Sequence, residues 1–82
     1  IEAIEKWNRF IAGDDDAYAS LYEEYVQDLY QYGLCFTSDT ELVKDCIQDL
    51  FVYLYANRSH LEISCQVKTY LLVSLKHNMG HQ

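Results

Sequence analysis

Apolar side chains recur at steps of three and four residues along almost the whole chain, the spacing that places them on one face of a helix. The alternation typical of strands is absent, and the chain contains no proline. This pattern predicts four helices joined by short links. We therefore expect an all-α fold, a compact four-helix bundle that forms one domain over residues 1–82.

The first two predicted helices meet at a glycine and an aspartate triplet. The first helix ends at Gly13, and its apolar positions are Ile4, Trp7, Phe10 and Ile11. Residues 14–16 are all aspartate, at a position where a helix N-terminus favours negative charge. The second helix has a face that we expect in the core, formed by Tyr18, Leu21, Tyr22, Tyr25, Leu29, Tyr32 and Phe36. Its opposite face is polar and carries Glu23, Glu24, Gln27, Asp28 and Gln31.

The third predicted helix has one apolar and one acidic face. Ser38 and Glu41 have the spacing of a capping box, so we expect Ser38 to be the N-cap. The apolar face predicts a core of Val43, Cys46, Ile47, Leu50 and Leu54. The other face is a continuous stripe of Glu41, Asp45, Gln48, Asp49 and Val52. Taken by itself, such a stripe is typical of a solvated surface.

A loop over residues 57–64 separates the third helix from the fourth. We expect Ser64 to cap the fourth helix, which runs to Met79 and stops at Gly80. Val67, Leu71 and Leu75 have the spacing of an inward face, while Lys68, Thr69 and Lys76 lie on another side.

The charge of the chain is unevenly distributed. The 82 residues carry a net charge of −7, which divides into −9 for residues 1–55 and +2 for residues 56–82. Such an acidic body suits a basic protein surface, and only the C-terminal third could face phosphates. Because the chain begins at Ile1 without a methionine, we expect it to be a fragment of a longer protein.

The cysteines and the apolar runs indicate a cytoplasmic protein. Cys35, Cys46 and Cys65 form an odd set without C-x-x-C spacing, which fits reduced thiols that act as small hydrophobic residues. No apolar run approaches the roughly 20 residues that a membrane-spanning helix needs.

Three stretches, in order, resemble one protein family. The run DCIQDLFVYLYANR (residues 45–58) resembles the second conserved subregion of bacterial sigma factors of the extracytoplasmic-function (ECF) group of the sigma-70 family. Upstream, GDDDAYASLYEEYVQDLYQYG (residues 13–33) is similar to the Gly-Asp opening and tyrosine-rich helix of that family. Downstream, VKTYLLVSLKHN (residues 67–78) is similar to its DNA-facing helix. The resemblance implies a sigma factor region 2 domain, a non-enzymatic subunit of RNA polymerase that needs no cofactor and no metal.

The resemblance also implies a protein partner for the acidic stripe. Asp45, Gln48 and Asp49, flanked by Glu41 and Val52, would contact the clamp-helix coiled coil of the largest polymerase subunit. Carboxylates beside an amide can accept charge-assisted hydrogen bonds from arginines there. The resemblance implies an anti-sigma factor as a further partner, and we expect no second DNA-binding domain of the family within residues 1–82.

Promoter DNA is the second partner that the resemblance implies. Residues 56–66 correspond to the segment that captures a flipped-out base of the minus-ten element, and the next helix would flank the melted single strand. The implied DNA-binding residues are Asn57, Arg58, His60, Ser64, Gln66, Lys68, Thr69, Tyr70 and Lys76. Because these include few cations, we expect the isolated domain to bind DNA weakly, and more weakly as salt rises.

Two other readings stay open on the residues alone. One is a generic all-helical interaction or adaptor module without DNA binding, whose partner would not depend on the acidic stripe. The other is a metal protein or an enzyme. His77 and His81 are four residues apart, but Gly80 lies between them and no Glu follows His77, so the zinc-protease pattern fails. The chain has no glycine-rich phosphate loop, and no base lies near Cys65 in the sequence.

Overall fold

The computed structural model describes residues 2–61 and 66–79. In chain order the elements are α1 (Glu2–Ile11), α2 (Asp15–Gly33), α3 (Thr40–Ala56), a short 3₁₀ helix η1 (Arg58–His60) and α4 (Val67–Met79). These ranges contain no strand, and the predicted all-α fold of four helices is confirmed. The predicted cap Ser64 and stop Gly80 lie outside the described residues.

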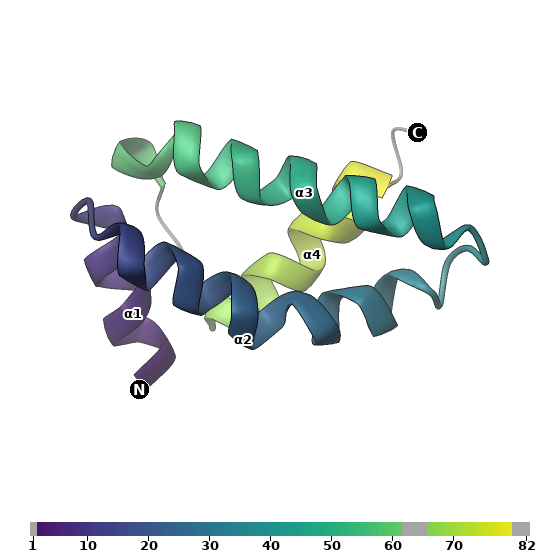
Figure 1. The fold of residues 1–82 in the computed structure, drawn as a ribbon, viewed down its shortest axis with the longest axis horizontal. Coiled ribbons are helices and arrows are strands. Elements are labelled where there is room, and N and C mark those ends of the chain that lie inside the picture. The colour runs from purple at the N-terminus through teal and green to yellow at the C-terminus, as the bar shows by residue number, and fades with distance from the viewer. Residues whose placement is uncertain (1, 62–65, 80–82) are drawn as a thin grey trace.

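The two long helices, α2 and α3, lie side by side and run in opposite directions (Figure 1). Tyr18 near the start of α2 contacts Phe51 near the end of α3, while Gly33 at the end of α2 meets Val43 near the start of α3. In Figure 1, α4 crosses behind both helices, and α1 packs beside the first half of α2. Each helix therefore contributes one face to a single core.

That core is formed only by apolar side chains among the described residues. Every position predicted to face inward on α3 and α4 is buried, and so are Trp7, Phe10, Leu21, Tyr25 and Leu29. Ala17 and Phe51 are also buried, although the periodicity did not single them out. No polar or charged side chain is buried in the described part, so the charged and polar side chains there are available at the surface for contacts with partners.

Two aromatic residues predicted for the core are exposed instead. Tyr22 is 41% exposed and Phe36 is 49% exposed, so both predictions are wrong. Tyr22 lies at the edge of the α2–α3 contact, where its ring meets that of Phe51 edge-on at 5.1 Å. Phe36 lies beyond Gly33, the last residue of α2, so the helical register no longer determines its direction.

Short polar side chains set the starts of the two long helices. Asp14 is the N-cap of α2, and its Oδ1 accepts hydrogen bonds from the backbone N–H groups of Asp16 (2.9 Å) and Ala17 (3.2 Å). The N-cap of α3 is Asp39 and not the predicted Ser38. The Asp39 side chain accepts from the Leu42 N–H at 3.1 Å, so the helix begins one residue later than expected.

Gly13 makes the turn between α1 and α2 possible. Its φ of 110° lies in a region that residues with a side chain rarely adopt. In the described part of the chain, no helix is long and apolar enough to cross a membrane.

Candidate functional site

The outward face of α3 is the first part of the candidate site. All five residues of the predicted acidic stripe, Glu41, Asp45, Gln48, Asp49 and Val52, are exposed there, as predicted. Their exposure follows from helix geometry, because the opposite face of α3 carries the buried residues. Val52 is 60% exposed, so an aliphatic side chain lies in the open within an acidic surface.

The carboxylates of this face differ in their ion pairing. Glu41 pairs with Lys44 one turn later, at 3.5 Å between Oε2 and Nζ. Within residues 2–61 and 66–79, neither Asp45 nor Asp49 forms an ion pair. Burial raises the pKa of the Cys46 thiol, and the charges of Asp49 and Asp45 raise it further. Cys46 is therefore a neutral, buried thiol and not a nucleophile.

A groove of about 530 Å³ between α3 and α4 adjoins the acidic face. Asp49 belongs to both features, because it also lines the groove. Tyr53 and Val73, from α3 and α4, are 55% and 60% exposed. The full lining is Asp49, Leu50, Tyr53, Tyr70, Val73, Ser74, His77 and Asn78.

A hydrogen bond between α3 and α4 holds the walls of this groove together. The Asn78 side chain donates from Nδ2 to the backbone carbonyl oxygen of Cys46, at 3.1 Å. Neither Asn78 nor Val73 was among the predicted site residues. Val73 could have been noticed, because it is an aliphatic residue outside the inward positions Val67, Leu71 and Leu75.

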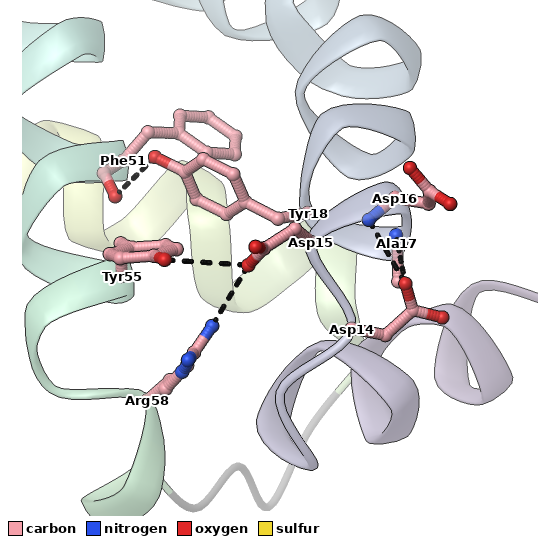
Figure 2. Close-up of polar contacts among 8 residues, drawn as sticks. All are labelled: Asp14, Asp15, Asp16, Ala17, Tyr18, Phe51, Tyr55 and Arg58. Carbon is pink, nitrogen blue, oxygen red and sulfur yellow. Dashed lines mark hydrogen bonds and ion pairs between the residues drawn. The ribbon is translucent and has the colours of Figure 1, made fainter.

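Arg58, which follows α3, is held against the start of α2 (Figure 2). Its Nη1 lies 3.2 Å from Oδ1 of Asp15, and its guanidinium lies 4.6 Å from the centre of the Tyr55 ring. The Tyr55 hydroxyl donates to the same Asp15 oxygen at 3.4 Å. An arginine predicted to contact DNA is thus already engaged by a carboxylate and an aromatic ring.

Tyr18 makes the neighbouring contact in Figure 2. Its hydroxyl donates to the backbone carbonyl oxygen of Phe51, at 2.8 Å, and so links α2 to α3. Burial raises the pKa of Tyr18, and the nearby Tyr55 and Tyr22 raise it further. This tyrosine therefore acts as a structural hydrogen-bond donor.

The structure does not gather the predicted DNA-binding residues into one patch of free cations. Lys68 pairs with Asp28 at 3.4 Å, and the Lys76 ammonium lies 5.7 Å from the centre of the Phe36 ring. Arg58 contacts Asp15, the first residue of α2, whereas Lys76 lies near Phe36, which follows the last residue of α2. The three cations are therefore spread along the length of α2, which is about 27 Å.

The remaining residues of that predicted set have mixed surroundings. His60, Gln66 and Thr69 are exposed. The Asn57 side chain donates to the backbone oxygen of Tyr53 at 2.9 Å, and Tyr70 is half-buried with its ring edge-on to Trp7 at 5.6 Å. Ser64 lies outside the described residues.

The structure brings together no metal site in the part of the chain that it describes. No group of three His, Cys, Asp or Glu side chains there is placed to hold a metal ion. His81, the partner considered for His77, is outside the described residues.

The chain matches no protein-family model, no curated protein and no solved structure.

Proposed function

We propose that this chain is a sigma factor region 2-like domain of the ECF group, which acts in transcription initiation in the bacterial cytoplasm. In this proposal it is a non-enzymatic subunit that docks α3 on the clamp helices of the largest RNA polymerase subunit. The observation that carries the proposal is the exposed face of α3. Asp45, Gln48 and Asp49 lie open beside a 60% exposed Val52, in the order that the family resemblance implies for polymerase contact.

The chemistry of this face suits a basic helical partner. Unpaired carboxylates can accept hydrogen bonds from arginine side chains without first giving up a partner in this domain. Val52 adds an apolar contact within the charged surface. The net charge of −9 over residues 1–55 would also attract a basic surface at long range.

The second part of the proposal is contact with the melted minus-ten strand. The exposed His60, Gln66 and Thr69 offer hydrogen-bonding groups to a single strand. Arg58 and Lys68 would have to exchange Asp15 and Asp28 for phosphates. An exposed ion pair such as Lys68–Asp28 is worth only about 0–1 kcal/mol, so its exchange has a small cost. Arg58 would also give up its contact with the Tyr55 ring. We accordingly expect DNA binding that is weak in isolation and productive in the assembled polymerase.

The test uses isothermal titration calorimetry to measure how tightly this chain binds a clamp-helix segment of a bacterial polymerase. Asp49→Arg should weaken binding by about 2 kcal/mol or more, roughly 30-fold in Kd. The matched control is Glu23→Arg, which makes the same charge change on the exposed face of α2 and should retain most of the affinity. Equal losses in both variants, or no binding by the unmodified chain at millimolar concentration, would reject docking through α3.

A polymerase-independent helical interaction module is the second candidate. The groove between α3 and α4 favours it, because an open groove with exposed Tyr53 and Val73 can bind a helix of any partner. Copurification with the polymerase core separates the two functions. The sigma-like function requires copurification that Asp49→Arg abolishes. The generic module requires a different partner, whose binding does not depend on Asp45 or Gln48, the stripe residues outside the groove.

A further inference from the structure

The groove between α3 and α4 offers apolar surface that a partner can bury, and the acidic face of α3 offers little of it. An exposed carboxylate that pairs with an arginine adds little affinity, because both groups lose hydration when they meet. The larger loss expected for Asp49→Arg comes from bringing like charges together. Tyr53 and Val73 are more than half exposed on the groove, so a partner that covers them removes apolar surface from water. Binding energy in protein interfaces concentrates in such central apolar pockets.

The position of Asp49 ties the groove to the acidic face. Asp49 lines the groove, and Asp45 lies one helical turn before it on the same face. A helix lying along α3 can therefore place a basic side chain against Asp45 or Asp49. An apolar side chain of the same helix can enter the groove. The volume of about 530 Å³ is within the range of pockets that hold ligands.

Charge decides which occupant the groove fits. A second copy of this chain would bring its own acidic body, with a net charge of −7, against Asp49 in the groove and the acidic stripe beside it. Like charges brought together at an interface oppose association. A basic amphipathic helix has the opposite sign and the matching apolar face.

We infer that the α3–α4 groove is the affinity-determining part of the docking face and takes an apolar anchor side chain from a basic amphipathic helix. This inference rests on the proposed function, because the basic helix is then one of the polymerase clamp helices. It assigns two roles to one face. Asp45 and Asp49 set the association rate and its dependence on salt, and the groove sets the dissociation rate.

The experiment measures both rate constants by surface plasmon resonance on an immobilised clamp-helix segment. Val73→Ser removes an exposed apolar side chain from the groove and should leave the fold intact. We expect its dissociation rate to rise about tenfold, with the association rate and salt dependence unchanged. Asp45→Asn should slow association and weaken its dependence on salt, with little change in dissociation. Val26→Ser makes the same change in the separate groove between α2 and α3 and should change neither rate. Because Val26 is half-buried against the core, circular dichroism first verifies that this control variant is folded.

The outcomes separate this inference from the function on which it rests. If Asp49→Arg abolishes binding while Val73→Ser binds and dissociates like the unmodified chain, the groove inference is wrong and α3 docking stands. If the unmodified chain does not bind the clamp-helix segment, the proposed function and the basic-helix occupant both fall. If sedimentation shows a dimer of this chain that Val73→Ser dissociates, the occupant is a second copy and the inference is overturned.

Discussion

Gly33 is the position where a single methyl group tests the packing of α2 against α3. It is the last residue of α2, and its backbone is buried against Val43. A Cβ at this position would lie 2.6 Å from one γ-carbon of Val43 and 3.2 Å from the other. Val43 is itself fully buried, so it has no solvent-filled space into which to move. Gly33→Ala should therefore force the two helices apart.

The expected size of the effect is a difference between two opposing terms. Alanine has a helix propensity up to about 1 kcal/mol better than glycine, and less at a helix end. Overpacking a well-packed core costs about 1–3 kcal/mol. We expect the packing term to exceed the propensity term, with a net loss of about 1 kcal/mol in the free energy of unfolding. For a domain of this size, that loss lowers Tm by about 4–8 °C.

A double-mutant cycle identifies the clash as the cause. Urea unfolding followed by circular dichroism gives the free energy of unfolding for Gly33→Ala, Val43→Ala and the double variant. Val43→Ala alone leaves a cavity and should cost about 2 kcal/mol. In that background Gly33→Ala no longer meets the valine methyl groups, so it should be neutral or stabilising.

Gly13→Ala is the control for a purely backbone effect. A Cβ there meets no atom within 4 Å, but the φ of 110° is unfavourable for alanine. Its loss of about 1 kcal/mol should be the same with and without Val43→Ala. The reasoning about Gly33 fails if Gly33→Ala leaves stability unchanged, or if Val43→Ala does not relieve its effect.

Two further predictions concern hydrogen bonds between helices. Asn78→Ala removes the donor to the Cys46 carbonyl oxygen and should lower the free energy of unfolding by about 0.5–1.5 kcal/mol in urea titrations; an unchanged urea midpoint would show that this bond does not stabilise the α3–α4 contact. Tyr18→Phe removes the donor to the Phe51 carbonyl oxygen and should cost a similar amount, about 1 kcal/mol, near neutral pH. Because the pKa of Tyr18 is raised in the folded state, its contribution is present below pH 10 and is lost as the pH rises through the raised value. Urea titrations between pH 8 and about pH 11 should therefore show that the free energy of unfolding declines less steeply with pH for Tyr18→Phe than for the unmodified chain. The raised pKa values of Tyr25 and Cys46 contribute to the decline that remains. Equal slopes in the two proteins would contradict this assignment.

The helices and the buried faces of α3 and α4 could be predicted from the sequence, but the first residue of α3 could not be fixed. The buried faces of α3 and α4 follow from a spacing of three and four residues, because a helix can bury only one stripe. The start of α3 was misplaced by one residue because serine and aspartate are both good N-caps. The difference between Ser38 and Asp39 depends on which side chain reaches the Leu42 N–H, and that depends on the path of the preceding loop.

The candidate site divides in the same way. The exposed stripe that includes Asp45 and Asp49 was predictable, because it lies opposite a face that had to be buried. The groove was not predictable, since its walls come from two helices whose crossing is set by the packing of the whole core. The partners of Arg58 were hidden for a similar reason. Asp15 is 43 residues away in the chain, and only the antiparallel packing of α2 and α3 brings the two together.

The sequence by itself thus determined the four helices, the buried faces of α3 and α4 and the acidic outer face of α3, since these depend on residues within a few turns of one another. Only the tertiary structure decided where side chains from different helices meet. It placed Gly33 against Val43, paired Lys68 with Asp28 and opened a groove beside Asp49. The physical reason is that the periodicity of the sequence gives only the direction of a side chain around its own helix. Contacts between two helices depend on the distance and crossing angle at which their buried side chains pack without voids.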